Sequence, residues 1–253
     1  MFAPSKVDAL AARTLHYPHS ILLKPMPYLF HPSGGLLYHL RAWRWRRTLW
    51  AQFHAEVRAW LSAWRPKSPH LVLIGPSGGY ALCAEFLARF TRISVLEPDP
   101  LARWLLRRRF PSAPLHWEVG GTLARTGGFD RLAAAYPDAA LLFCNLLGQE
   151  LQGQAADFNR GAWLAELEQA LRGRSWASWH DLVSTARAPT GRPPSCSGHA
   201  IALEELLGHY WLGGRLEFLD HETASLCPAA PRRHTIWHLA PRRYHLIEWL
   251  CTP

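Results

Sequence analysis

Apolar and polar residues alternate along this chain in blocks that predict strands and helices in turn. Short apolar runs followed by polar turns predict strands at 70–75, 92–97, 114–118, 139–144 and 175–183. Between these runs, apolar residues recur at three- and four-residue steps and predict helices at 79–90, 99–109, 122–135 and 157–172. Regular alternation of this kind is typical of βαβ units, and so of a parallel sheet with helices on both faces.

The two ends of the chain follow different patterns. After a helix expected at 200–209, two β-rich runs at 214–226 and 234–250 have no helix between them, so we expect them to form an antiparallel hairpin. Residues 1–35 are rich in Pro, His and Gly and predict an irregular arm with a short helix near Val7–Thr14.

Residues 36–64 predict one long amphipathic helix or two shorter ones, which Pro66 and Pro69 would end. The apolar stripe that carries this prediction consists of Leu36, Leu40, Trp43, Trp50, Phe53, Val57, Trp60 and Trp64. A tryptophan stripe at helical spacing is normally a buried face, and we expect the same here.

These elements together predict an α/β fold. We expect a doubly wound, mostly parallel seven-stranded sheet with an antiparallel C-terminal hairpin and a helical N-terminal extension. With 253 residues, 49% of them hydrophobic, the chain is long enough for one sizeable core. We place a boundary between an N-terminal arm and cap, residues 1–69, and a Rossmann-like domain, residues 70–253.

Composition indicates a cytoplasmic protein without a membrane span. No apolar run approaches the roughly 18 residues of a spanning helix, and the N-terminus lacks the basic-then-apolar order of a secretion signal. The five cysteines are scattered and odd in number, which favours reduced thiols. The cysteines show no metal-ligand spacing, and the Cys196-Ser197-Gly198-His199 cluster is too short to form a metal site without further ligands. We therefore expect no metal site.

The formal charge of +9 is compatible with a nucleic-acid partner, but charge alone does not favour one. Arginine greatly outnumbers lysine, a bias that the coding habits of a GC-rich genome also produce. If the charge marks a polyanionic partner, Arg41, Arg44 and Arg58 are the expected clamp, because they lie off the apolar stripe of residues 36–64.

The most informative segment is the glycine-rich turn after the first predicted strand. Gly75-Pro76-Ser77-Gly78-Gly79 follows His70–Ile74, and Glu97-Pro98-Asp99 follows the second strand. Glycines let a backbone approach a ligand closely, and an acid after the next strand accepts hydrogen bonds from ribose hydroxyls. Asp99 also fits the N-cap of the helix that follows.

The same turn fits the G-x-S-x-G nucleophile elbow of α/β-hydrolases, with Ser77, Asp181 and His238 in the chain order of a triad. This alternative leaves Glu97 without a role. The strands and oxyanion loop that precede such an elbow are also missing from the first 69 residues.

Residues 70–183 resemble the class I S-adenosylmethionine-dependent methyltransferases. Gly75 and Gly79 match the first and last glycines of the family's turn, and Ser77 replaces the middle one. Glu97 matches the family's ribose-binding acid, and the closing hairpin matches the family's antiparallel seventh strand. The family's usual acid two positions before the first glycine is Leu73 here.

The resemblance implies methyl transfer from S-adenosylmethionine, with S-adenosylhomocysteine as product, to an acceptor that the sequence does not identify. A catalytically inactive scaffold of the same fold is the alternative. The implied cofactor contacts are Gly75, Pro76, Ser77, Gly79, Glu97, Pro98, Glu118, Val119, Asn145 and Leu146. Residues expected at the methyl group, or as acid or base at the end of the fifth strand, are Asn145, His180 and Asp181. An N-terminal helix lids the cofactor in many family members, so we expect Tyr38 or His39 to border the site.

Overall fold

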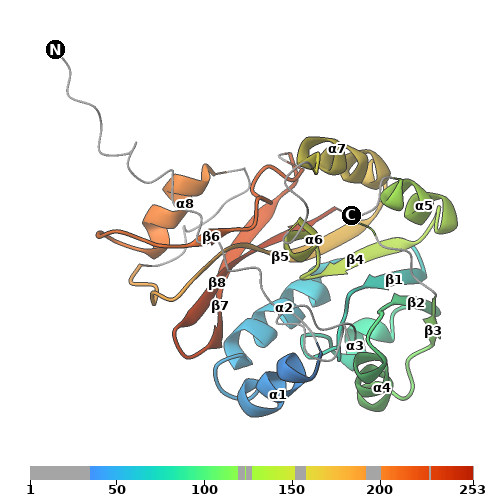
Figure 1. Cartoon of the computed structure of the whole chain (residues 1–253). Helices are drawn as coiled ribbons and strands as arrows, with labels where there is room; N and C mark the ends of the chain where they lie inside the picture. The colour runs from blue at the N-terminus through green and yellow to red at the C-terminus, as the bar shows by residue number, and fades with distance from the viewer. Residues whose placement is uncertain are drawn as a thin grey trace, which may run out of the picture.

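A twisted sheet lies at the centre of the computed structural model, which describes residues 35–118, 123, 127–151, 158–191, 201–227 and 229–252. The strands follow the order β3-β2-β1-β4-β5-β8-β7, and the short β6 pairs with β5 (Figure 1). The strands are β1 (His70–Ile74), β2 (Arg92–Leu96), β3 (Leu115–Trp117), β4 (Ala140–Cys144), β5 (Trp176–Thr185), β6 (Leu219–Asp220), β7 (Arg232–Ala240) and β8 (Arg243–Cys251).

Strand directions confirm the predicted α/β class. The pairs among β1 to β5 are all parallel, whereas β8 runs antiparallel to both β5 and β7. The position of the closing hairpin was predicted wrongly. It forms wholly within 232–251, because Pro241 and Arg242 make a tight turn in which Arg242 takes a positive φ of 57°. Of the other β-rich run, 214–226, only β6 is a strand.

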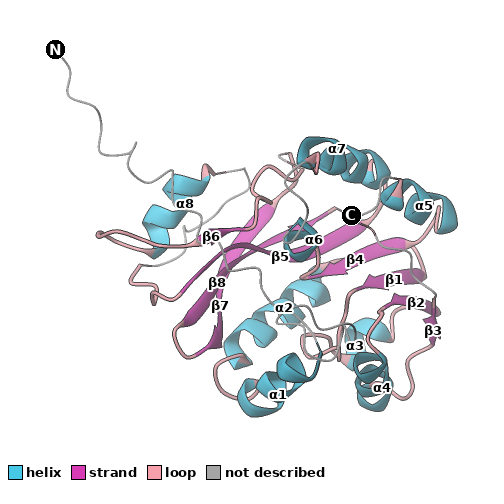
Figure 2. Ribbon diagram, viewed as in Figure 1, coloured by secondary structure: helices cyan, strands magenta, loops and turns pink. Residues whose placement is uncertain are grey.

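Helices cover both faces of the sheet (Figure 2). Helices α1 to α4 share one apolar cluster with one face of the sheet, and α5 to α7 share another with the opposite face. Helix α8 packs on the far end of β5. The helices are α1 (Gly35–Trp45), α2 (Ala51–Ala63), α3 (Ala84–Leu87), α4 (Pro100–Arg109), α5 (Gly128–Ala135), α6 (Leu147–Leu151), α7 (Arg160–Leu171) and α8 (Leu203–Tyr210). Among the described residues, none of the helices is long and apolar enough to cross a bilayer.

The N-terminal amphipathic segment forms two helices, and the buried face of α1 differs from the prediction. Trp43 is 74% exposed and Leu40 is 51% exposed, whereas His39 and Ala42 are buried. The helix therefore directs a polar histidine inward, which an apolar stripe cannot reveal. The expected stripe is correct for α2, where Phe53, Val57, Trp60 and Trp64 are all buried. The short helix expected near Val7–Thr14 lies outside the described residues.

The helix expected at 79–90 is only one turn long. The glycine turn continues through a Leu82 N–H···O=C Gly79 bond of 3.2 Å, and Cys83 is extended, so α3 begins at Ala84. This arrangement gives the chain a longer irregular segment above the sheet, between β1 and α3.

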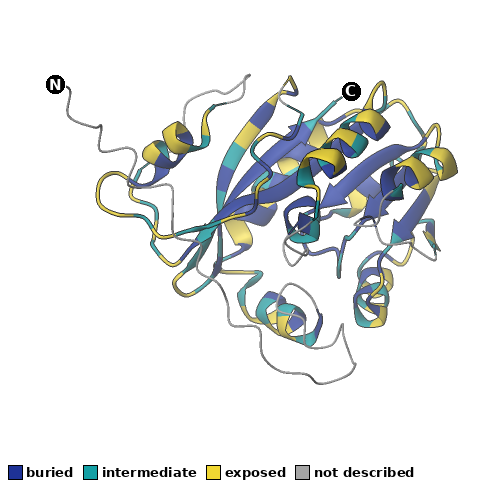
Figure 3. Ribbon diagram, turned by 45° about the horizontal axis from the view of Figure 1, so that its top comes forward, coloured by how far each residue is buried: buried dark blue, intermediate teal, exposed yellow. Residues whose placement is uncertain are grey.

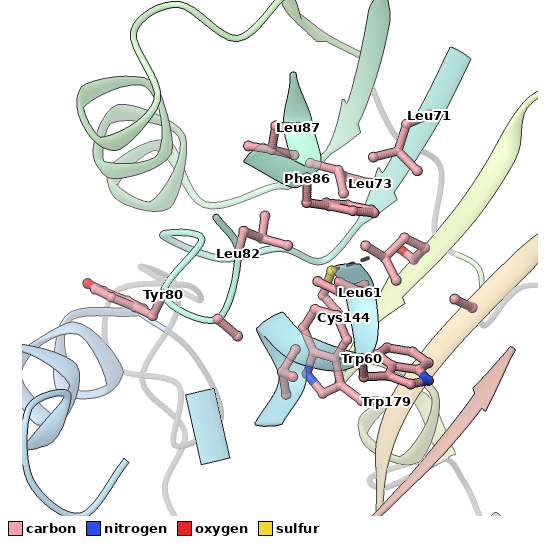
Figure 4. Packing of buried hydrophobic residues seen from close by; sticks show 14 of the residues in the cluster. Trp60, Leu61, Leu71, Leu73, Tyr80, Leu82, Phe86, Leu87, Cys144 and Trp179 are labelled. Atoms are coloured by element: carbon pink, nitrogen blue, oxygen red, sulfur yellow. Dashed lines mark hydrogen bonds between the residues drawn. The ribbon is translucent and has the colours of Figure 1, made fainter. Parts of the chain in front are cut away.

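The central strands β1, β4 and β5 are buried on both faces, while exposed residues lie on the outer sides of the helices and in the loops (Figure 3). Under the glycine turn, Leu73 of β1 is completely buried and packs in a cluster with Phe86 and Leu82, while Cys144 and Trp60 continue that cluster below (Figure 4). This core fixes the ends of β1 and β4, from which the candidate site is built.

Candidate functional site

The turn after β1 has the tight backbone that close ligand approach requires. Gly75, Ser77 and Gly79 have positive φ values of 65°, 50° and 66°. A Cβ atom at Gly79 would lie 2.4 Å from Leu106 Cδ1 of α4, so only glycine fits between this turn and the helix. The turn is held to β2 by a Gly75 N–H···O=C Leu96 bond of 3.0 Å.

Glu97 joins this turn to the end of β2. Its Oε2 atom accepts a hydrogen bond from the Ser77 N–H at 2.8 Å, and its Oε1 atom accepts one from the Asp99 N–H at 3.0 Å. A carboxylate has about four acceptor positions, so both oxygens can still accept a further bond. Burial raises the pKa of Glu97, while the two backbone N–H groups act against that rise.

Helix α1 covers this half of the site. His39 Nδ1 lies 2.9 Å from the Tyr80 hydroxyl, and His39 Nε2 lies 3.4 Å from Asp99 Oδ2. Asp99 caps α4 as expected, because its Oδ1 atom accepts from the Leu101 N–H at 2.8 Å. Burial, followed by the nearby Tyr80 and Cys144, raises the pKa of Tyr38 on the same helix.

The other half of the site lies at the end of β4 and within β5. Asn145 follows β4 with a positive φ of 55°, and its N–H donates to Trp179 O at 2.8 Å. Its Nδ2 atom donates to Asp181 Oδ2 at 3.3 Å, and Asp181 Oδ1 lies 3.0 Å from His245 Nδ1. Burial alone would raise the pKa of Asp181, but His245, His221 and Asn145 together outweigh that effect and the pKa falls to about 2.

The structure does not bring His180 together with Asp181. Successive side chains of a strand point to opposite faces, so His180 is directed to the other face of β5. There it is completely buried, with Nδ1 3.0 Å from Ser178 Oγ and Nε2 3.5 Å from Glu248 Oε2. The partner of Asp181 is instead His245 of β8, which the sequence analysis missed because the pairing of β5 with β8 was not known.

The remaining predicted contacts differ in position. The Glu118 carboxylate accepts from Ser94 Oγ at 2.9 Å and lies 3.7 Å from Arg92 Nη2, so it bonds to residues within β2. Val119 lies outside the described residues. The other three predicted contacts lie around the turn, where Pro76 is buried, Pro98 is exposed, and Leu146 packs against Gly75.

The arrangement expected of a hydrolase is not formed. His238 stacks on Tyr244 with ring centroids 4.4 Å apart, and Asp181 bonds to His245 instead. The backbone N–H of Ser77 donates to Glu97 Oε2, which fits a role in the turn. Ser77 therefore has no triad with Asp181 and His238.

The three arginines singled out from the sequence have different surroundings. Arg44 is exposed, whereas Arg41 and Arg58 are half-buried. Arg58 Nη2 donates to the carbonyl oxygen of Tyr80 at 3.2 Å, so this side chain supports the segment after the glycine turn. A polyanion clamp made of all three is therefore not one continuous exposed surface.

The sheet order, with β8 reversed between β5 and β7, decides the fold. The chain has a Rossmann-like α/β fold with one reversed strand near the sheet edge. No family model and no curated protein matches it. Among solved structures it is similar to the DhpI–S-adenosylhomocysteine complex, at 12% identity over 86% of this chain and 93% of that one (TM-score 0.42). It is also similar to the N-methyltransferase NodS from Bradyrhizobium japonicum WM9 with S-adenosylhomocysteine, at 13% identity over 81% and 88% of the chains (TM-score 0.41). A third is CalS10, an amino pentose methyltransferase from Micromonospora echinaspora, at 17% identity over 93% and 100% of the chains (TM-score 0.39).

Proposed function

We propose that this protein transfers a methyl group from S-adenosylmethionine to an acceptor molecule. The observation that carries the proposal is the position of Glu97. Its carboxylate lies at the carboxyl end of β2 and accepts a hydrogen bond from the turn after β1. In doubly wound sheets, ligands bind beyond the carboxyl ends of the strands, and an acid at this place accepts bonds from ribose hydroxyls.

In this proposal the glycine turn and Glu97 bind the cofactor, and residues at the end of β4 and within β5 position the acceptor. The turn from Gly75 to Gly79 supplies a closely approachable backbone, and the free acceptor positions of Glu97 orient the ribose. Leu73 is completely buried, so it takes no part in holding the charged amino-acid end of the cofactor. Bound S-adenosylmethionine supplies the electrophilic methyl group.

Asn145 and Asp181 lie on the acceptor side of this arrangement, after β4 and on β5. We assign to them the positioning of the acceptor, because alignment of a nucleophile with a reactive group can supply much of the rate enhancement. We also assign Tyr38 and His39 on α1 to the cover of this site, since His39 Nδ1 lies 2.9 Å from the Tyr80 hydroxyl after the glycine turn.

Calorimetric titration with S-adenosylhomocysteine tests the proposal. Replacing Glu97 with Ala removes a charged acceptor, so we expect affinity to fall by about 1.5–3 kcal/mol, roughly 10- to 150-fold. The matched control is Glu118→Ala, since that carboxylate follows the next strand but lies against Ser94 and Arg92. We expect the control to bind like the unmodified protein.

Two results would refute the proposal. Absence of binding by the unmodified protein at millimolar ligand would leave the inactive scaffold of the same fold as the better description. Equal losses in the Glu97 and Glu118 variants would show that the ribose is not held at the end of β2.

A further inference from the structure

Three potential metal ligands meet behind Asn145. Asp181 of β5, His245 of β8 and His221, which follows β6, are all buried, and one ligand atom from each lies within 4.8 Å of the other two. Around a tetrahedral ion with bonds of about 2.0–2.1 Å, such atoms would be roughly 3.3 Å apart. Small side-chain rotations would therefore bring all three onto one ion.

The ring nitrogens of both histidines are only partly satisfied. His245 and His221 are each 6% exposed. His245 Nε2 and His221 Nδ1 are buried, and neither has a partner in hydrogen-bonding geometry among the described residues. The His245 nitrogen that faces the carboxylate is Nδ1, 3.0 Å from Asp181 Oδ1, so an ion bound by these side chains would replace that hydrogen bond.

A second layer of hydrogen bonds already orients two of the three side chains, those of His221 and Asp181. Ser184 Oγ lies 3.2 Å from His221 Nε2, and Asn145 Nδ2 donates to Asp181 Oδ2. Thr223 Oγ1 donates to the Asp181 carbonyl oxygen at 2.8 Å, which holds the segment carrying His221 against β5. Such outer partners are typical of metal sites, where they fix the orientation of the ligands.

A β-bulge in β5 allows Ser184 and Asp181 to contribute to the same cluster. Asp181 and Ser184 are three positions apart, so they would lie on opposite faces of a regular strand. The register shifts between Asp181 and Val183, and Ser184 then pairs with His245 while Asp181 pairs with Ile247. Since His245 and Ile247 share a face of β8, the bulge places Asp181 and Ser184 on that same face.

We propose that Asp181, His221 and His245 bind one divalent transition-metal ion. Two imidazoles and one carboxylate suit zinc, iron, manganese or cobalt, and they leave coordination positions open for water or a substrate oxygen. No metal site was predicted from the sequence. The three proposed ligands come from distant segments, so no recognisable spacing points to them.

The site also defines a class of acceptor, and this step depends on the proposed function. The ion lies beside Asn145, on the side where the acceptor is placed. A divalent ion lowers the pKa of a bound hydroxyl or water and orients it, so an acceptor with a hydroxyl group coordinates the ion through oxygen. The proton of that hydroxyl leaves to solvent or to a nearby base as the oxygen–methyl bond forms and the sulfur–methyl bond breaks.

Metal titration of the protein alone tests the site. Chelator-treated protein is titrated with Zn²⁺ by calorimetry and with Co²⁺ by visible absorption, both without S-adenosylmethionine. We expect one equivalent to bind, with Zn²⁺ displacing Co²⁺. Replacing His221 or His245 with Ala should weaken binding by more than tenfold. Ser184→Ala should weaken it by about 10- to 100-fold through the outer layer.

The matched control is His116→Ala, which removes an exposed histidine of β3. It should bind the metal like the unmodified protein. Circular dichroism checks that each variant is folded. If a His221 or His245 variant does not fold, the stoichiometry of the unmodified protein and the affinity of Ser184→Ala still test the metal site. Less than half an equivalent bound by the unmodified protein, or an equal loss in the His116 variant, would overturn the proposal. Because no cofactor is present, failure here is separate from failure to bind S-adenosylhomocysteine.

Discussion

Replacing Gly79 with Ala should destabilise the protein far more than the same change at another glycine with a positive φ. Two effects add at this position. Gly79 has a φ of 66°, and a left-handed conformation costs a residue with a Cβ about 1–2 kcal/mol. The new methyl group would also lie 2.4 Å from Leu106 Cδ1 and 2.9 Å from Phe110 Cε2.

The second effect is large because the neighbours cannot move away freely. Leu106 is completely buried and belongs to the core under α4. Forcing an extra methyl group into a well-packed core typically costs about 1–3 kcal/mol. The sum predicts a loss of about 2–5 kcal/mol in the free energy of unfolding, a large part of the stability of an ordinary domain.

Gly173 provides the matched control. Its φ is 73°, but a Cβ there would meet nothing within 4 Å, so Gly173→Ala should lose only the backbone contribution of about 1–2 kcal/mol. Urea unfolding followed by tryptophan fluorescence measures both losses at unchanged m-value. Similar losses in the two variants would refute the argument that α4 packs directly against the glycine turn.

Three further predictions concern other parts of the molecule. Burial, helped by Arg58, lowers the pKa of His54 to about 3, so only the unfolded state takes up this proton between pH 6.5 and 3. Stability should therefore fall by up to about 4 kcal/mol as the pH drops through that range, and His54→Leu should flatten the decline in denaturant titrations. Serine-directed fluorophosphonate probes should leave the protein unlabelled, and stoichiometric labelling lost in Ser77→Ala would restore the hydrolase alternative. If single-stranded RNA binds, each phosphate contact should contribute about −0.7 to the slope of log affinity against log salt concentration. Replacing the exposed Arg44 and Arg47 with Gln should therefore make this slope less steep.

The half of the site around Glu97 could be predicted from sequence because it is local. A strand, a glycine turn, a helix and a second strand ending in an acid are consecutive in the chain, and parallel pairing places both strand ends at one edge. For Glu118 the same reasoning gives the position in the chain but not the direction of the side chain. Only the structure shows that its side chain turns back toward Ser94 and Arg92 near the beginning of β2.

The other half depends on distant parts of the chain. His245 reaches Asp181 through the β5–β8 register, and His221 reaches it through a loop held by Thr223. Neither relation leaves a periodic signal in the sequence. His180 was a natural candidate because it adjoins Asp181 in the chain, yet strand alternation directs adjacent side chains to opposite faces.

The two faces of β5 near its bulge carry different groups of buried polar side chains. On one face, His180 and His234 surround Glu248, whose pKa is lowered to about 2 by these side chains despite its burial. That face is an ionic network inside the sheet, which Arg232 joins with Nη1 3.1 Å from Glu248 Oε1. On the other face, Asp181 is surrounded by imidazoles with unpaired nitrogens. Bulges are common next to active sites and redirect individual side chains, and this one places Asp181 and Ser184 on the same face of β5.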